Sequence, residues 1–388
     1  DNHGRVDCRK TELYKRGYLR TPIVNVYERL VFRMLLGLRR MKSQPLVHKW
    51  FFPRNHRMAL CLGHDVDRVF SAEAGLDGLA SFRRGKIVRG LAEIFQGFVA
   101  SSLALLCKLR VAHARNFEWL VPDFLTRRLV AYNPFWNFDQ YLAVEKMVGA
   151  VSSFYFLNHS TCMDSDYGFV NPLVKDVMTD LRENGCEVGL HGSYYSCDDV
   201  DKIKGEKVLL EKAVGHKVSG VTQHFVRLII PDTWVHQDRA GLMYDSSFGF
   251  ARDVGFRAGV CLPFRPWDHN LQAALSILEI PFIIMDGALF QRQYLALSFD
   301  EAFKISRSIV DTVAEYNGVL GLQWHVAVDR KRKKFWFDLY EKLLRYSLKY
   351  DPWFTNGENM AEWWNLRRQE SFDDFSWNGS ELSFCLVA

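Results

Sequence analysis

Short apolar runs typical of buried strands alternate with helix-like segments along most of this 388-residue chain. The apolar runs lie at residues 58–64, 151–157, 186–190, 218–223, 242–245, 259–264, 277–285 and 319–324. Clear signals bound some of the helices, such as Asn171-Pro172 at one start and Asn184-Gly185 at its end. Such alternation favours parallel strands joined by right-handed crossovers, and about seven units close most simply as a barrel. We therefore expect an α/β protein built on a (β/α) barrel.

The sequence divides into three parts. Residues 1–57 form a basic, aromatic N-terminal helical segment, and residues 58–350 contain the strand–helix alternation of the barrel. Within the barrel, residues 71–135 read as a mostly helical insertion after the first strand. Residues 351–388 form a C-terminal helix and a tail whose weak alternation indicates a β element.

The charge balance and the cysteines narrow the partners and the compartment. The formal net charge is only +5, and no basic block is interleaved with regularly spaced aromatic residues. We therefore expect no nucleic-acid partner. The 8 cysteines are scattered and form no CxxC motif, which favours a reducing compartment and predicts a cytoplasmic protein.

Two segments leave a peripheral membrane contact open. Residues 87–111 are the most apolar stretch, but Arg89, Glu93 and Gln96 interrupt it. This pattern indicates a core or interfacial helix rather than a membrane span. The basic run at 329–334 is expected to be a solvated loop that opens a helix, and contact with phosphate or acidic lipid is the alternative.

Acidic and imidazole side chains follow four of the predicted strands. Asp65 and Asp67 come at the end of the first strand, and His191, His224 and His325 each end a later one. Because the C-terminal ends of parallel barrel strands share one face, we expect these side chains to converge. Together they form a ligand set for Zn²⁺ or a similar ion. Taken singly, each has a common alternative role as a turn former, helix cap or hydrogen-bonded rim residue.

The end of the first strand also resembles a known family. Residues 62–67 (Leu-Gly-His-Asp-Val-Asp) are similar to the first motif of the polysaccharide deacetylases, carbohydrate esterase family 4. They are closer still to a branch of that superfamily in which the motif reads Thr-His-Asp-Val-Asp. Further similar segments follow in the family's order at residues 153–157, 187–194, 222–227, 244–247, 255–259, 278–286 and 322–325. The order of the motifs, more than any single motif, makes the resemblance specific.

The resemblance implies a distorted (β/α)₇ barrel that removes N- or O-acetyl groups from a sugar polymer or glycan precursor. In this family a water molecule activated by a metal ion attacks the acetyl carbonyl group. Carried over by position, Asp65 is the expected base and His325 the acid that protonates the leaving amine. Arg227 is expected to pair with the Asp65 carboxylate, and a rim ion pair is its ordinary alternative.

The sequence departs from the family pattern in its second motif. The family places two histidines four residues apart, but here His191 is followed four positions later by Tyr195. We therefore expect Asp67 and His191 to be metal ligands, with His224 replacing the missing histidine. The expected cofactor is a divalent metal, with Zn²⁺ the first choice. If these residues bind no metal, the protein is a catalytically inactive relative.

Several residues carry weaker signals for substrate binding. Asp245 and Arg257 are candidates to orient the substrate, or else form a buried structural pair. Trp324 suits stacking on a sugar ring, although packing in the core is the more frequent use of tryptophan. Asp286 is either a further group at the barrel mouth or a turn cap. His64 is left out of the ligand set because strand alternation points it to the opposite face.

The sequence thus predicts a metal-dependent hydrolase that removes acetyl groups from an N-acetylated sugar in a surface-polysaccharide or glycolipid pathway. Its expected partner is a glycan or another sugar-containing small molecule. One alternative is a hydrolase of another C–N bond, such as a cyclic amide, on the same scaffold. The other is a catalytically inactive glycan-binding homologue that keeps the barrel.

Overall fold

The computed structural model describes residues 1, 3–69, 135–161, 163–328 and 333–387. All but the last residue of the insertion expected at 71–135, and most of the basic run at 329–334, therefore lie outside the described residues. Among the described residues, no helix combines the length and the apolar character needed to cross a membrane.

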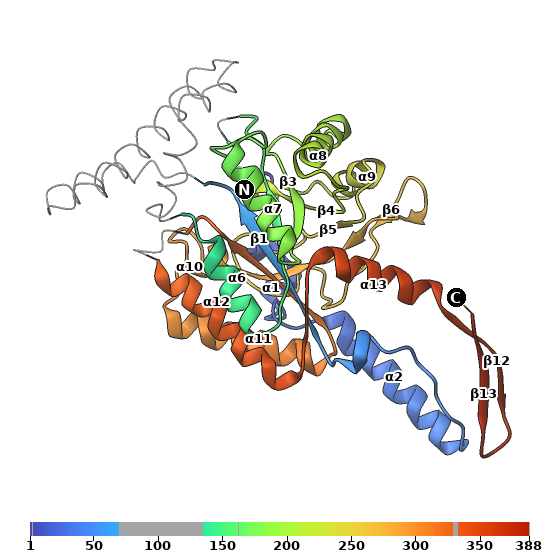
Figure 1. Cartoon of the computed structure of the whole chain (residues 1–388). Helices are drawn as coiled ribbons and strands as arrows, with labels where there is room; N and C mark the ends of the chain where they lie inside the picture. Colours follow the sequence, from blue (N-terminus) through green and yellow to red (C-terminus); the bar gives the residue numbers. More distant parts are fainter. Residues whose placement is uncertain (2, 70–134, 162, 329–332, 388) are drawn as a thin grey trace, which may run out of the picture.

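The described chain is organised around one curled sheet of nine parallel strands (Figure 1). The strands are β1 (Ala59–Val66), β2 (Ser153–Phe156), β3 (Glu187–Gly192), β4 (Gly220–Gln223), β5 (Tyr244–Asp245), β8 (Leu278–Glu279), β9 (Phe282–Met285), β10 (Val319–His325) and β11 (Trp353–Thr355). Their order is β8-β5-β4-β3-β2-β1-β10-β9, and β11 pairs with β1 beside this path. This incomplete parallel barrel confirms the expected α/β fold.

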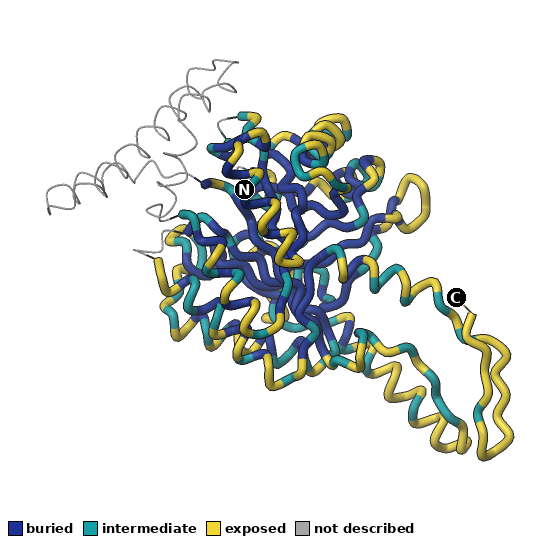
Figure 2. The backbone as a smooth tube through the Cα atoms, viewed as in Figure 1, coloured by how far each residue is buried: buried dark blue, intermediate teal, exposed yellow. Residues whose placement is uncertain are grey.

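Helices connect these strands and cover the outside of the sheet (Figure 1). They are α6 (Phe138–Met147), α7 (Pro172–Glu183), α8 (Val200–Val214), α9 (Asp232–Arg239), α10 (Asp286–Phe290), α11 (Phe299–Glu315), α12 (Lys334–Ser347) and α13 (Gly357–Gln369). The expected start of α7 is confirmed, because the Asn171 side chain accepts hydrogen bonds from the first-turn backbone amides. The buried residues concentrate along the sheet and the inner helix faces, as the dark tube in Figure 2 shows.

Parts of the segments that flank the barrel cover the N-terminal ends of the strands, whereas His3 and Arg5 reach the opposite end. Residues 1–57 contain α1 (Glu12–Lys15) and α2 (Ile23–Met41), and the backbone amide of Val24 in α2 donates to the carbonyl of Gly259. At the start of α13, the Gly357 amide donates to the Ser153 hydroxyl, 2.8 Å away. The chain ends in a hairpin of β12 (Ser371–Trp377) and β13 (Leu382–Val387), which confirms the expected β element in the tail.

One predicted strand was wrong. Residues 259–264 form no strand, although a shorter hairpin of β6 (Trp267–Asp268) and β7 (Ala273–Ala274) follows them. The backbone amide of Cys261 donates to the Asn25 side chain of α2 instead of to a neighbouring strand. Gly259 also has a positive φ of 67°, which breaks an extended run. The segment therefore contacts the sheet only locally, through an isolated bridge of Phe264 with Glu279 of β8 and a bond from the Val319 amide to the Cys261 carbonyl.

Candidate metal and catalytic site

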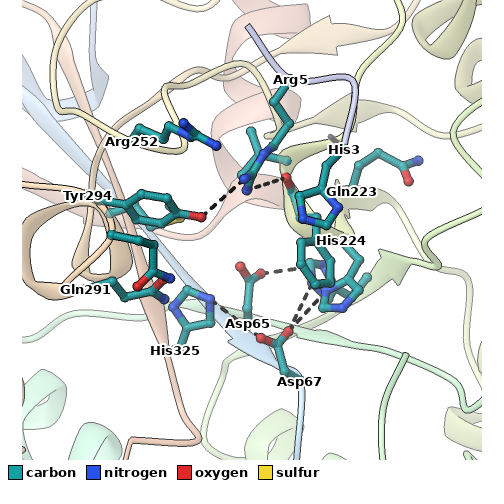
Figure 3. Close-up of a pocket in the computed structure, with 15 residues that line it drawn as sticks. His3, Arg5, Asp65, Asp67, Gln223, His224, Arg252, Gln291, Tyr294 and His325 are labelled. Atoms are coloured by element: carbon teal, nitrogen blue, oxygen red, sulfur yellow. Dashed lines mark hydrogen bonds and ion pairs between the residues drawn. The ribbon is translucent and has the colours of Figure 1, made fainter. Parts of the chain in front are cut away.

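A cavity of about 440 Å³ lies at the C-terminal ends of the central strands (Figure 3). The parallel pairing of β1 with β10 sets Asp65 beside His325. The pairing of β3 with β4 brings His191 level with Thr222, two residues before His224. The cavity is lined by His3, Arg5, Asp65, Asp67, His191, Gln223, His224, Phe225, Val226, Arg252, Met285, Gln291, Gln293, Tyr294 and His325.

Three ligand-type atoms converge on one side of this cavity. The Nε2 atom of His191 lies 3.1 Å from Nδ1 of His224 and 3.2 Å from Oδ1 of Asp67. The His224 Nδ1 atom lies 3.5 Å from the same Asp67 oxygen. The three residues thus form a group that can hold a metal ion, as expected from the sequence. Tyr195 is exposed and packs on Tyr194. The second imidazole therefore comes from His224, directly after β4, and not from the turn after β3.

Backbone carbonyls set the tautomers of the two histidines. A carbonyl oxygen only accepts, so Nδ1 of His191 donates to the Thr222 carbonyl, 3.0 Å away. In the same way, Nε2 of His224 donates to the Met163 carbonyl at 3.0 Å. In the neutral form that a metal ligand must have, each imidazole therefore turns its lone pair towards the other imidazole and towards Asp67. Three electron-rich atoms face one another, and a cation between them removes their mutual repulsion.

The donor set fits a divalent cation on two further grounds. Oδ1 of Asp67 is buried and accepts no hydrogen bond in the described structure, although buried carboxylate oxygens are normally satisfied. A tetrahedral ion with bonds of 2.0–2.2 Å separates its ligand atoms by roughly 3.3–3.6 Å. The separations of 3.1, 3.2 and 3.5 Å are close to that range.

The carboxylates and imidazoles of the cluster shift one another's pKa values. Burial raises the pKa of Asp67, but the neighbouring His224 and His191 outweigh burial and hold this pKa well below its ordinary value. Burial alone would lower the pKa of His191. The carboxylates of Asp65 and Asp67 outweigh burial and raise the pKa of His191 above its ordinary value. A negative Asp67 is thus the favoured state, which suits a metal ligand.

Asp65, the expected base, is positioned by neutral partners. Its Oδ1 atom accepts hydrogen bonds from Nε2 of Gln323 at 2.5 Å and from the Thr222 hydroxyl at 3.1 Å. The expected pairing with Arg227 is wrong. The Arg227 guanidinium instead packs over the Tyr194 ring, 4.1 Å from its centroid, and Nε donates to the His3 carbonyl. The reason is local, because Phe225 and Val226 have positive φ angles of 60° and 57° that turn the chain after β4.

His325, the expected acid, is held by a buried carboxylate. Its Nδ1 atom lies 2.5 Å from Oδ1 of Asp286, and its backbone amide donates to Oδ2 of the same side chain. Burial opposes the charged form of His325, but Asp286 and Asp67 outweigh burial and raise its pKa to about 10. The Nε2 atom of His325 is 3.6 Å from Oδ2 of Asp67. Asp286 is fully buried in the first turn of α10, where its Oδ1 atom also accepts from the Gly287 amide, and it does not line the cavity, so it positions His325.

Three residues expected to bind substrate lie away from the cavity. Trp324 is fully buried, and its indole nitrogen donates to the Trp336 carbonyl. Asp245 is also fully buried, where it accepts from Trp234, Gln237 and Ser247. Arg257 donates to the Gly249 carbonyl and packs over the Phe248 ring. None of the three lines the cavity, so these predictions were wrong. His64 faces away as expected, since it contacts Glu145 in the core.

The sequence reasoning missed Gln323 and Thr222. Gln323 stands two residues before His325 on β10, so strand alternation places both side chains on one face. Thr222 has the same relation to His224 at the end of β4. That spacing was the available signal. No sequence pattern indicated the opposite wall, where Arg5, Arg252 and Tyr294 line the cavity.

Comparisons with known proteins identify the fold. No protein-family model matches the sequence, and no curated protein matches it. Among solved structures, a presumed polysaccharide deacetylase from Mycobacterium smegmatis is similar with a TM-score of 0.50 and 14% identity, covering 84% of this chain and 96% of that chain. A probable polysaccharide deacetylase from Pseudomonas aeruginosa PAO1 has a TM-score of 0.50 and 15% identity, covering 83% and 95%. The Puue allantoinase has a TM-score of 0.50 and 14% identity, covering 84% and 95%.

At these identities the comparisons show a shared fold. The chain has the fold of the polysaccharide deacetylases, and the resemblance inferred from the motifs is confirmed at that level. The particular branch with the His-Asp-Val-Asp motif stays a prediction. The same fold occurs in an allantoinase, so fold alone does not choose between acetyl removal and cleavage of another C–N bond.

Proposed function

We propose that this chain, which has the fold of the polysaccharide deacetylases, is a metal-dependent hydrolase that removes acetyl groups from an N-acetylated sugar. The observation that carries the proposal is the convergence of Asp67, His191 and His224 within one cavity that also contains Asp65 and His325. Metal-assisted hydrolysis requires metal ligands, a carboxylate that can accept a proton and an imidazole held by a second carboxylate. All three kinds of group line or adjoin this cavity.

In this proposal Asp67, His191 and His224 hold a divalent cation, with Zn²⁺ the expected ion because two imidazoles and one carboxylate form a common zinc set. Such a cation supplies Lewis-acid chemistry, since it polarises a carbonyl oxygen and lowers the pKa of water. The remaining chemistry belongs to side chains of this protein.

Asp65 is proposed to take a proton from the attacking water. One of its oxygens is occupied by Gln323 and Thr222, and these bonds fix the plane of the carboxylate. No described residue donates a hydrogen bond to its other oxygen, Oδ2. That oxygen is therefore available to accept a proton, as a general base must be.

His325 is proposed to donate a proton to the leaving amine. Asp286 accepts the hydrogen bond from Nδ1, which leaves Nε2 as the nitrogen that faces the cavity. The raised pKa of His325 keeps this nitrogen protonated at neutral pH. Without a proton on Nε2, the amine would have to leave as an unstable anion.

The proposal is tested by metal analysis together with acetate release. Purified full-length protein should contain about one equivalent of a divalent metal and release acetate from N-acetylhexosamine oligomers. Asp65→Asn should lower kcat by about 10²- to 10⁴-fold while retaining the metal. Asp300→Asn, at an exposed position on α11, is the matched control and should be fully active. Full activity in Asp65→Asn would refute the assignment of the base.

The same experiment separates the alternatives. The similarity in fold to an allantoinase makes a cyclic amide the second candidate substrate, and its hydrolysis gives a ring-opened product without acetate. A catalytically inactive glycan-binding homologue would bind N-acetylated oligosaccharides in calorimetry and release neither product. Protein without bound metal that binds a glycan would favour this last reading over the enzyme.

A further inference from the structure

Helix α2 presents a long exposed apolar face, and Figure 2 shows most of this helix as exposed. From Leu30 to Met41 every residue except Leu36 is exposed. At 100° per residue, most apolar residues of α2 fall within an arc of roughly 140°, and Val26, Phe32 and Leu36 lie outside it. The exposed members of this apolar arc are Val24, Tyr27, Leu30, Val31, Met34, Leu35, Leu38 and Met41. An apolar surface of this kind in a soluble chain marks an interaction site.

The charge around the apolar arc is positive. Arg33, Arg39, Arg40 and Lys42 flank it, and none of them forms an ion pair with a described residue. The sequence contains no Asp or Glu between Glu28 and Asp65. Amphipathic helices with apolar residues on one face and arginines on the other bind at the interface of anionic membranes.

A second cavity, of about 430 Å³, adds to the positive charge at this end of the barrel. Its walls are formed by Lys49, Arg265, Ala274, Trp364, Arg367 and Arg368. The Lys49 ammonium group donates to the carbonyls of Arg367 and Glu370. Arg367 in turn donates to the Trp50 carbonyl. We call this cavity the basic pocket.

The cations of the basic pocket lack carboxylate partners in the described structure. Arg265 hydrogen-bonds to the Asn365 amide and to backbone carbonyls, which carry no negative charge. Burial lowers the pKa of Arg265, and the charge of Arg368 lowers it further. Four crowded cations favour an anion that neutralises them, and a phosphate group has the charge and acceptor geometry for Arg and Lys.

The segment that follows α2 connects the flank of this helix to the basic pocket. The chain folds back so that the His48 ring contacts Phe32, which lies roughly 60° outside the apolar arc, and His48 also stacks near Trp50. The carbonyl of Trp50 accepts a hydrogen bond from Arg367, which lines the basic pocket. The surface that carries α2 and the basic pocket lies at the N-terminal ends of the strands, where α13 and α2 cover the barrel, and the candidate catalytic site lies at their C-terminal ends.

We propose that this surface docks on an anionic lipid bilayer, with the apolar arc of α2 entering the interface and the basic pocket binding a lipid phosphate group. The competing occupant is a second copy of this chain. The β12–β13 hairpin exposes Phe375 and Leu386, and its charged residues are Asp373, Asp374 and Glu381, so it could cover α2 of another copy. The hairpin would bury the apolar arc with few charges, whereas an anionic bilayer matches both the apolar arc and the cations of the basic pocket, which have no carboxylate partner in the described structure.

The test is co-sedimentation of the full-length protein with phosphatidylcholine vesicles, with and without phosphatidylglycerol. We expect binding only to the anionic vesicles, and less binding at high salt. Each arginine near an anionic surface changes partitioning by roughly fivefold. Arg39→Gln/Arg40→Gln and Arg265→Gln/Arg368→Gln should each weaken binding by roughly 25-fold. Arg307→Gln, an exposed position on α11, is the matched control and should bind like the parent.

Other outcomes would overturn the proposal in identifiable ways. Equal binding to both kinds of vesicle, or no loss in the arginine variants, would contradict it. A dimer that forms without lipid and dissociates in Leu35→Asp would make the second copy the occupant. Inorganic phosphate that binds the basic pocket in calorimetry, without vesicle binding, would indicate a soluble ligand. Folding of each variant is checked by circular dichroism. Asp65→Asn should bind vesicles normally, so the outcome is independent of the proposed catalysis.

Discussion

The buried carboxylate of Glu187 at the start of β3 should make the fold less stable as the pH rises. Its Oε2 atom accepts from the Ser153 hydroxyl at 2.6 Å, the Tyr244 hydroxyl at 2.8 Å and the Glu358 amide at 2.9 Å. Its Oε1 atom is buried and has no partner in the described structure. Burial is the main cause that raises the pKa of Glu187 from 4.5 to about 7, and the charge of Glu358 adds to it.

The sign follows from proton binding in the two states. Below pH 4.5 Glu187 is protonated in both the folded and the unfolded chain and contributes no pH dependence. Between pH 4.5 and about 7 the unfolded chain releases its proton while the folded chain retains it, so stability falls as the pH rises. Each pKa step corresponds to about 1.4 kcal/mol, so the full loss above pH 7 is about 3 kcal/mol.

Glu187→Gln tests this reasoning, because the neutral amide imitates the protonated acid and can still accept at the Oε2 position. Urea unfolding at pH 4.5 and at pH 8 should show that the variant gains about 3 kcal/mol relative to the parent at the higher pH. Glu183→Gln, at the exposed end of α7, serves as the control. Its free energy of unfolding relative to the parent should be the same at pH 4.5 and at pH 8. If the free-energy difference between Glu187→Gln and the parent is the same at both pH values, the buried charge is not the cause.

Further predictions concern the site and the core. Thr222→Val removes one acceptor from His191 but leaves the backbone carbonyl, so zinc affinity measured by chelator competition should fall about tenfold, with Thr222→Ser restoring it. Asp286→Asn removes the carboxylate that holds His325, and kcat for acetate release should fall by about a hundredfold or more while the metal content stays the same. Trp324→Ala should destabilise the fold by about 3–5 kcal/mol in denaturant unfolding, because this side chain is fully buried. Metal affinity and kcat unchanged in the first two variants would contradict the roles given to their partners.

The sequence predicted the convergence at the site because that convergence depends on topology alone. Parallel strands place their C-terminal ends on one edge, so Asp67, His191 and His224 meet wherever the loops run. The replacement of the missing imidazole by His224 follows from the pairing of neighbouring strands. In β3 and β4, His191 lies opposite Thr222, and His224 follows two residues later. The metal group is therefore set by sheet register, which strand patterns predict well.

Side-chain direction beyond the strands was harder to predict. Arg227 stands only three residues after His224, but two non-glycine residues with positive φ turn the chain between them. Such angles are rare for a β-branched residue such as Val226, and no propensity rule predicts them. The error with Trp324 was avoidable, because alternation along β10 places it opposite to His325. The partners of Asp245 come from α9 and from the turn after β5, contacts that one sequence does not reveal.

The two proposals together constrain how a substrate reaches the cavity. The basic pocket and α2 lie at the N-terminal ends of the strands, whereas Asp67 and His325 lie at the C-terminal ends. A protein docked through the first end therefore opens its cavity away from that bilayer. The acetylated sugar then approaches from the aqueous side, and docking need not restrict turnover of a soluble oligosaccharide. If both proposals hold, membrane docking and acetate release belong to opposite barrel ends, and a variant that loses one should retain the other.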